Sequence, residues 1–499
     1  MIKPKQLSII YTDCLESFEN DKPKFLSMLE THLDIDALIP LSFVMHYNNY
    51  TGRPREYPLR AFVLSLIIQR IFSIQTDRLL IVFLTYAREL REFCGFEKIP
   101  DASKFTRFKQ DFKDDLKTMF DGLVDLTEPI CQDIDSNLAS MTIFDTSGIE
   151  AYVQENNPKY LNALIKRLKA WKTVKGLDDS YDPYKAAYGL MPTHSHVDPA
   201  IKQMYINGHF CYSYKFGMIT NGLGIVRDIN FYDENYYLEH PEIQVSKKEN
   251  SPDEDKSLAD SKALLPTLKD FFVKHPAIQP SVFLGDSAFD SIDIYNELLG
   301  KDGLGFHKAF IPLNSAHNLK YPDCPINEDG VPCCPNDSTL PMKPETSDSH
   351  LRCGMPTFKF VCPKMSWKKC EDGKYRRRTS CENPCTDSPC GRMFHVYPEK
   401  NLRTFPGTVR GTDEWDDTYK IRVAVEKSIN HFKDSFCVAG RKTRNALTSE
   451  ADLYLAGITQ LVTVLLADSI HQHKYKSKTV DFCIAVFKCM IQSSAYLFI

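Results

Sequence analysis

Strand-like runs alternate with helical segments between residues 140 and 313, and this alternation constrains the fold more than any other feature of the chain. The runs are short, rich in β-branched and aromatic residues, and bounded by turn residues, as in buried strands. One pair of runs surrounds Asn221-Gly222, a sequence typical of a hairpin turn. The predicted strands are Met141–Asp145, two runs between Phe216 and Phe231, Ser281–Asp286 and Ala309–Leu313. Strands that alternate with helices indicate a mixed α/β layer.

The first 135 residues are expected to form a helical DNA-recognition domain. Thr76 can cap a helix that continues to Leu90, and a break over 95–100 precedes an amphipathic helix with a basic outer side. The basic residues are Lys104, Arg107, Lys109, Lys113 and Lys117. Two helices around a break are compatible with a helix-turn-helix-like module in which Lys104 and Arg107 contact DNA. A solvated lysine face on a helical bundle is an equally open alternative.

Residues 314–410 interrupt the alternation and hold nine of the 16 cysteines. A structureless loop of this length is improbable inside a compact domain, so we expect an inserted subdomain between two parts of one domain, 136–313 and 411–499. The cysteines are Cys324, Cys333, Cys334, Cys353, Cys362, Cys370, Cys381, Cys385 and Cys390. The spacing Cys381-x3-Cys385-x4-Cys390 is compatible with a Zn²⁺ site completed by Cys362 or Cys370. Reduced structural cysteines are the alternative, because no C-x2-C pair is present.

Composition excludes several classes of protein. The 499 residues carry 61 Lys and Arg against 65 Asp and Glu, with 43% hydrophobic residues, as in an ordinary globular protein. The N-terminus lacks a signal-peptide pattern, and four polar residues interrupt the apolar stretch Leu453–Ile470, which favours a core helix over a membrane span. We therefore expect a cytoplasmic protein. The scattered cysteines are interpreted as core residues: Cys14, Cys94, Cys131, Cys211, Cys437, Cys483 and Cys489.

The most informative motif begins at Tyr419 and follows the spacing Y-x2-R-x3-E-x6-K, ending at Lys433. Seven residues of an α-helix rotate by about 700°, so Glu426 lies about 20° from Tyr419 and Lys433 about 20° further on. Together with Arg422 they form one stripe. A carboxylate beside a tyrosine, an arginine and a lysine can hold a divalent cation and the phosphates that it binds.

This motif resembles the Y-R-E-K signature of DDE transposases of bacterial insertion sequences, whose catalytic core is RNase H-like. Asp145 and Asp286 match the positions of the two aspartates that end strands in this family, and Glu426 matches the glutamate of the signature helix. Arg55–Phe112 looks like the helical N-terminal domain of these transposases. The resemblance implies an RNase H-like mixed sheet flanked by helices, with the cysteine-rich subdomain inserted before the signature.

The resemblance also implies a chemistry. Asp145, Asp286 and Glu426 would hold two Mg²⁺ (or Mn²⁺) ions that cleave a phosphodiester and join its 3′-OH to another phosphate. Tyr419, Arg422 and Lys433 would hold DNA phosphates. The protein would bind the terminal inverted repeats of its element as a homodimer on double-stranded DNA, in the nucleoid region of a bacterial cytoplasm, and would join the ends to target DNA.

Two basic clusters lie outside the motif. Lys359–Arg378 contains eight Lys and Arg against two acids, and phosphate contacts of this kind give sequence-independent affinity. Within it, Trp367 either stacks on an extruded base or packs in the core of the insert. A second cluster surrounds Trp171 and is either another DNA surface or a solvated helix.

Two other functions remain open from the sequence. One is a domesticated or inactive relative that binds DNA without cutting it. The other is a metal-dependent nuclease on the same fold that hydrolyses DNA without strand transfer.

Overall fold

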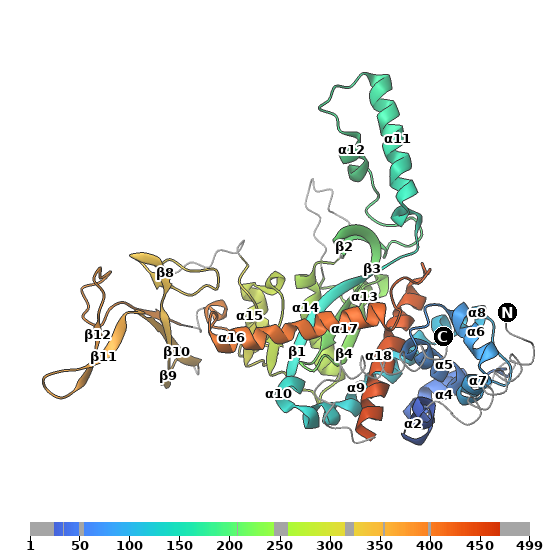
Figure 1. Ribbon diagram of the computed structural model, residues 1–499, viewed down its shortest axis with the longest axis horizontal. Helices are drawn as coiled ribbons and strands as arrows, with labels where there is room; N and C mark the ends of the chain where they lie inside the picture. The colour runs from blue at the N-terminus through green and yellow to red at the C-terminus, as the bar shows by residue number, and fades with distance from the viewer. Residues whose placement is uncertain are drawn as a thin grey trace, which may run out of the picture.

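The structure is a computed structural model that describes residues 24–32, 34–48, 54–206, 208–243, 258–314, 324–352, 355–397 and 401–469. Figure 1 shows a central body from which an arm of two helices and a cysteine-rich insert project in different directions. Cys14, Cys353, Cys483 and Cys489 lie outside the described residues.

A six-stranded mixed sheet lies at the centre of the body. Its order is β2-β3-β1-β5-β6, and β4 pairs with β3 outside this path. β1 runs antiparallel to β3 and parallel to β5, which in turn runs parallel to β6. The strands are β1 (Met141–Glu150), β2 (Lys202–Ile206), β3 (His209–Thr220), β4 (Val226–Phe231), β5 (Val282–Leu284) and β6 (Lys308–Phe310). The predicted mixed α/β layer and the hairpin around Asn221 are confirmed.

Helices cover the sheet with apolar faces. α17 buries Val425, Ile429 and Phe432. The helices of this part are α10 (Ser136–Ala139), α13 (Glu234–Glu239), α14 (Asp260–Lys274), α15 (Ile292–Leu299), α16 (Asp413–Tyr419), α17 (Val423–Asp434) and α18 (Ala446–Ser469). Short 3-10 turns are η1 (Gln154–Asn156), η2 (Ser287–Phe289), η4 (Leu402–Thr404) and η5 (Lys420–Arg422).

The described part of the first 135 residues is helical, as predicted. Thr76 caps α6 by accepting a hydrogen bond from the Leu79 N–H at 3.1 Å. The helices are α2 (Lys24–His32), α3 (Ile35–Leu38), α4 (Leu41–Tyr47), α5 (Leu59–Ile71), α6 (Asp77–Tyr86), α7 (Arg88–Cys94), α8 (Ala102–Asp111) and α9 (Lys113–Ile134). Gly95 ends α7 in the left-handed region at φ 88°, and Asp101 caps α8.

These helices share one hydrophobic core with the C-terminal helix α18. α18 packs against α5, α8 and α9, and 89% of its most apolar 18-residue window is buried. The predicted core helix is therefore confirmed. The same packing makes one prediction wrong: Lys109 does not lie on the basic outer side of α8 but is buried, with its Nζ 2.9 Å from Asp77 Oδ2 and 3.3 Å from Asp452 Oδ1.

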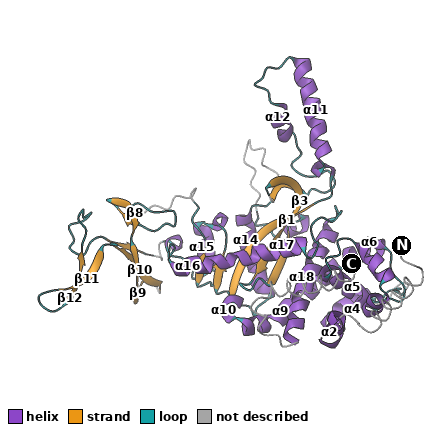
Figure 2. Ribbon diagram, viewed as in Figure 1, coloured by secondary structure: helices purple, strands orange, loops and turns teal. Residues whose placement is uncertain are grey.

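The insert forms three small sheets with a core of its own. Its strands are β7 (Cys333–Cys334), β8 (Asp337–Pro341), β9 (Lys343–Arg352), β10 (Met355–Val361), β11 (Met365–Lys369), β12 (Tyr375–Thr379) and β13 (Met393–Val396). Figure 2 shows the contrast between these strands and the helices at the other end of the molecule. The returning chain is anchored to the body, because the Arg403 guanidinium donates to both carboxylate oxygens of Asp290 at 2.8 and 2.6 Å.

The arm consists of α11 (Pro158–Lys175) and α12 (Pro183–Gly189). It follows β1 and projects away from the sheet (Figure 1). Ile165 is the one residue of α11 that is buried, whereas Trp171 is largely exposed and its ring contacts the Tyr181 ring edge-on at 5.4 Å between centroids. The second basic cluster therefore lies on a solvated, projecting helix.

Candidate active site

The sheet register brings the two predicted aspartates to the same place. Ile143 of β1 pairs with Leu284 of β5, and Asp145 and Asp286 each follow their strand's paired residue by two positions. Side chains two residues apart in a strand point to the same face, so the two carboxylates come to one face at neighbouring positions. One prediction is wrong here: Asp145 does not end its strand, because β1 continues to Glu150 in antiparallel pairing with β3.

The Y-R-E-K residues lie on the helical segment that crosses this position. The predicted single α-helix is wrong in detail, because the 3-10 turn η5 joins α16 to α17 at Lys420–Arg422. A 3-10 turn winds more tightly than an α-turn, so the predicted stripe is shifted at Tyr419 relative to Glu426. Arg422 ends this turn and Glu426 lies in the first turn of α17.

Arg422 lies among the three acids. Its Nη1 is 3.9 Å from Asp145 Oδ2, and its Nη2 donates a hydrogen bond to Glu426 Oε1. Burial alone would lower the pKa of Arg422, but the nearby Tyr419, Glu426, Asp145 and Asp286 raise it instead. Residues from β1, from the end of β5 and from α17 therefore converge on one guanidinium.

Asp145 is a partly buried carboxylate with other acids close to it. Its pKa is raised to about 6, chiefly by burial and also by the negative charges of Asp260 and Glu426. The Thr146 N–H, which donates to Asp145 Oδ1 at 2.8 Å, and Arg422 oppose this shift without cancelling it. Crowded carboxylates offer only oxygen ligands, which suit Mg²⁺ or Mn²⁺. A divalent ion would also reduce the repulsion between their negative charges.

Asp260 is a fourth acid at this site that the sequence did not reveal. It is the first residue of α14, where it accepts hydrogen bonds from Thr146 Oγ1 of β1 and from Lys215 Nζ of β3. No motif surrounds it in the sequence. Its position next to Asp145 arises only from the packing of α14 on the sheet.

Tyr419 contacts the side chains of Trp415 and Arg422. Its ring stacks on the Trp415 ring with 4.8 Å between centroids and 21° between planes, and the Arg422 guanidinium lies 5.8 Å from its centroid. Burial raises the pKa of Tyr419, and Asp286 and Glu426 add to the effect. The phenol is therefore neutral and lies beside the acids and Arg422.

Lys433 is tied to the same strand as Asp145. It is buried, and its Nζ donates to Ser147 Oγ at 2.6 Å. Burial lowers its pKa, against the opposing influence of Cys211, Asp434 and Asp145. Lys433, which was predicted to contact phosphates, is therefore hydrogen-bonded to β1, whereas Arg422 lies beside the carboxylates.

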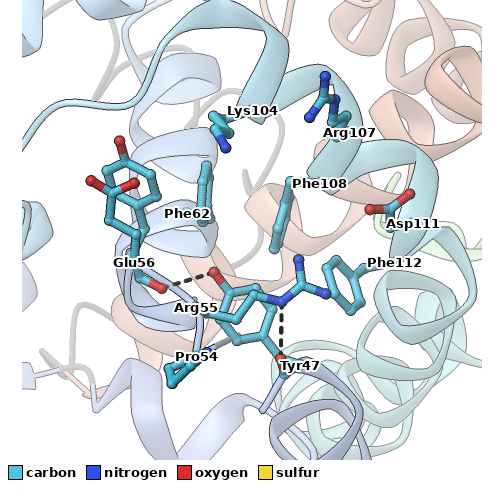
Figure 3. A pocket seen from close by; sticks show the side chains of 11 residues that line it. Tyr47, Pro54, Arg55, Glu56, Phe62, Lys104, Arg107, Phe108, Asp111 and Phe112 are labelled. Carbon is cyan, nitrogen blue, oxygen red and sulfur yellow. Dashed lines mark hydrogen bonds between the residues drawn. The ribbon is translucent and has the colours of Figure 1, made fainter. Parts of the chain in front are cut away.

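Lys104 and Arg107 lie elsewhere, at a pocket of the N-terminal helices with a volume of about 300 Å³. Figure 3 shows both side chains at one edge, above the rings of Phe62 and Phe108. Arg55 lies opposite, with its guanidinium 5.1 Å from the Phe112 ring centroid. The remaining lining residues are Tyr47, Pro54, Glu56, Tyr57 and Asp111. None of the three acids lines this pocket, which combines aromatic walls with three cationic groups.

Trp367 is exposed on the β11–β12 hairpin, with 59% of its surface accessible. The alternative that it packs in the core of the insert is therefore wrong. Arg377, its register partner, lies over its ring at 4.9 Å from the centroid. Lys359 and Arg377 both pair with Glu345, at 3.1 and 2.8 Å, so part of the predicted basic cluster is neutralised within the insert.

The cysteines of the insert do not form a compact thiolate cluster within the described residues. No three of them bring their sulfur atoms within 4.8 Å of one another, and Cys324 Sγ donates to the Cys333 carbonyl oxygen at 3.1 Å. Cys381, Cys385 and Cys390 are partly exposed. The proposed Zn²⁺ site therefore stays a prediction. Cys94, Cys131, Cys211 and Cys437 are buried in the body, as predicted.

Comparison with known proteins gives one family match, over part of the chain. Residues 13–111 match the family model described as Transposase domain (DUF772). This match supports a DNA transposase in general. No curated protein matches the chain. The cryo-electron microscopy structure of the piggyBac transposase synaptic complex with hairpin DNA is similar over 94% of this chain and 81% of that chain, at 10% identity and a TM-score of 0.36.

Proposed function

We propose that this protein is a DDE-type DNA transposase of the bacterial insertion-sequence kind, with Asp145, Asp286 and Glu426 as catalytic residues on an RNase H-like core. The observation that carries the proposal is the convergence of these acids, which are remote in the sequence, on the guanidinium of Arg422. The mixed sheet supports it, because neighbouring parallel strands deliver both aspartates beneath one helix.

The three acids would hold two Mg²⁺ or Mn²⁺ ions, which supply activation of the attacking oxygen and stabilisation of the leaving oxygen in phosphodiester cleavage and strand transfer. Asp145, the central acid, would be one of their ligands. Asp260 would support Asp145 from a neighbouring position. Its carboxylate accepts hydrogen bonds from Thr146 and Lys215 and adds negative charge next to Asp145.

Arg422 has a second role in this proposal. Its guanidinium pairs with Asp145 and Glu426, and it would bind a DNA phosphate when these acids serve as metal ligands. A planar guanidinium suits this exchange because carboxylates and phosphates offer it similar bidentate geometry. Tyr419 would donate a hydrogen bond to the same phosphate, while Lys433 would add positive charge from beneath.

DNA binding would use surfaces beyond the active site. Lys104 and Arg107 would contact phosphates of the terminal inverted repeats at the edge of the aromatic pocket, and Trp367 would stack on an exposed base. Two repeats have to be handled together, so we propose a homodimer on DNA, acting in the bacterial cytoplasm. A Zn²⁺ ion in the insert remains part of the proposal.

An excision assay tests the catalytic assignment. A plasmid carrying the element's own inverted repeats is incubated with the full chain and Mg²⁺, and excised ends are quantified. Asp145→Asn, Asp286→Asn and Glu426→Gln should each reduce excision by more than about 100-fold, because loss of a second-shell partner alone costs about 10–100-fold. Asp434→Asn, at an exposed acid of the same helix, is the control that should retain excision. A folded active-site variant with normal excision removes that residue from the site.

The same assay separates the alternatives. Supplying a target plasmid distinguishes a transposase, which yields joined products, from a nuclease, which yields only cut ends. A DNA-binding relative without catalysis would retard labelled repeat DNA in a gel and leave it uncut at every Mg²⁺ and Mn²⁺ concentration.

A further inference from the structure

Three ligand-type side chains gather at the far end of β1. A carboxylate oxygen of Glu150, an imidazole nitrogen of His209 and the sulfur of Cys211 all lie within 4.8 Å of one another. His209 Nε2 lies 4.0 Å from Glu150 Oε2. Among the residues that the structure describes, this is the one group of three or more His, Cys, Asp or Glu with such spacing.

Strand pairing brings these three residues together. Glu150 pairs with Ser213 of β3, while His209 and Cys211 pair with Ile206 and Met204 across the β2–β3 hairpin. The tip of the hairpin lies directly over Gly148, where an added Cβ would come 2.8 Å from Ser213 Oγ and would collide with the Ile206 side chain. Gly148 therefore permits a close approach that places the start of β3 beside the end of β1.

The ligand set selects a class of metal. A thiolate and an imidazole exclude Mg²⁺ and Ca²⁺, which prefer oxygen, and one thiolate, one imidazole and one carboxylate suit Zn²⁺ with a water in the fourth position. Tetrahedral Zn²⁺ ligands lie about 3.3–3.8 Å apart, given bonds of about 2.0–2.3 Å. Glu150 and His209 are more than half exposed, so their side chains can move inward by the small amount required.

We propose that Glu150, His209 and Cys211 form a Zn²⁺ site that fastens the tip of the β2–β3 hairpin to the end of β1. The site is separate from the carboxylates of the candidate active site. It lies close to the signature helix, however, because Cys211 is within electrostatic reach of Lys433. Burial, with a contribution from Glu150, raises the pKa of the Cys211 thiol to about 11. Binding of a cation through this sulfur would therefore release the thiol proton.

Zinc analysis of the full chain tests the proposal. The background variant Cys381→Ser/Cys385→Ser/Cys390→Ser removes three cysteines of the insert, whose zinc would otherwise be counted. The protein is stripped with chelator, incubated with Zn²⁺, desalted and measured by elemental analysis. We expect one zinc per chain in this background, and affinity at least about 100-fold weaker after His209→Ala or Cys211→Ser. His194→Ala, at an exposed histidine before β2, is the matched control and should keep the ion.

Cobalt provides the second measurement. Co²⁺ bound in the same background should show a sulfur-to-cobalt charge-transfer band, which Cys211→Ser should abolish. Because His209 is exposed, His209→Ala should fold, as circular dichroism can verify. Zinc content equal in the background protein and in folded His209→Ala, or a cobalt band that survives Cys211→Ser, overturns the proposal.

Discussion

The Lys433 ammonium donates a hydrogen bond to Ser147 Oγ at 2.6 Å, joining α17 to β1 two residues beyond Asp145. The two residues are 286 positions apart in the chain. This bond ties the signature helix to the strand that carries Asp145, alongside the buried apolar residues of α17. The positions of Arg422 and Glu426 relative to Asp145 therefore depend on a contact outside the carboxylates themselves.

A double-mutant cycle measures this contact. Ser147→Ala leaves a buried ammonium without its hydroxyl partner and should destabilise the protein by about 1–3 kcal/mol. Lys433→Met removes the charge but keeps the apolar stem, so adding Ser147→Ala to Lys433→Met should cost much less than Ser147→Ala alone. Urea denaturation gives the free energies of unfolding, and exposed Ser366→Ala is the control. Additive effects of the two changes would contradict a direct contact.

Asp452 of α18 should be far more important for stability than its single charge suggests. Arg70, Lys109 and Arg441 lie 2.6, 3.3 and 3.3 Å from its carboxylate, and these groups are almost fully buried. Asp452→Asn leaves the three cations with Asp77 as their remaining acid in this cluster, so we expect a loss of about 3–5 kcal/mol in the free energy of unfolding.

The control for this prediction is Asp36→Asn. Asp36 pairs with Arg60 at 3.2 Å, but both side chains are largely exposed, so the change should cost less than about 1 kcal/mol. Equal urea midpoints for the two variants would show that the buried cluster contributes no more than a surface ion pair.

Local patterns predicted the elements but not the long-range partners. Thr76 could be identified as a cap and Asn221-Gly222 as a hairpin turn because their chemistry acts within a few residues. Lys109 was misplaced because its partner Asp452 is 343 residues away, and helical spacing alone gave it an outward position. Burial of a lysine requires an acid in the core, and that acid cannot be found from periodicity.

At the candidate site, too, local patterns could be predicted from the sequence and long-range packing could not. The spacing of Tyr419, Arg422 and Glu426 and the two strand-like runs indicated where the acids are. The tightened turn at Lys420–Arg422 and the role of Asp260 could not be predicted, since both depend on how α14 and α17 pack on the sheet. Glu150, His209 and Cys211 carry no motif spacing, because a strand end and a hairpin tip bring them together.

Salt dependence should reveal the contribution of Lys104 and Arg107 to DNA binding. Each phosphate contact adds about 0.9 to the slope of log affinity against log salt concentration, so Lys104→Ala/Arg107→Ala should make the slope shallower by about 2. Fluorescence anisotropy with labelled repeat DNA over a range of KCl concentrations measures it. Exposed Lys301→Ala is the control, and an unchanged slope in the double variant would exclude both residues from the phosphate contacts.

His431 should make the stability of the protein depend on pH. It lies on α17 with its ring 4.3 Å from the Phe436 ring, and burial lowers its pKa to about 4 from the ordinary 6.5. A depressed histidine pKa means that the folded state favours the neutral ring, so its contribution is complete above about pH 6.5 and is lost as pH falls toward 4. Between pH 7 and pH 4 the loss should be about 3 kcal/mol.

His431→Gln removes this titration while keeping a polar side chain. Urea unfolding of wild type and variant at several pH values should therefore show curves that converge or cross as pH falls, since only the wild type takes up a proton at this ring when unfolding exposes it. His194→Gln, at an exposed histidine, serves as the matched variant. Parallel curves for wild type and His431→Gln from pH 7 to pH 4 would mean that the ring takes up its proton without leaving its place on α17, and the packing of the signature helix around Phe436 would then have to be looser than its contacts indicate.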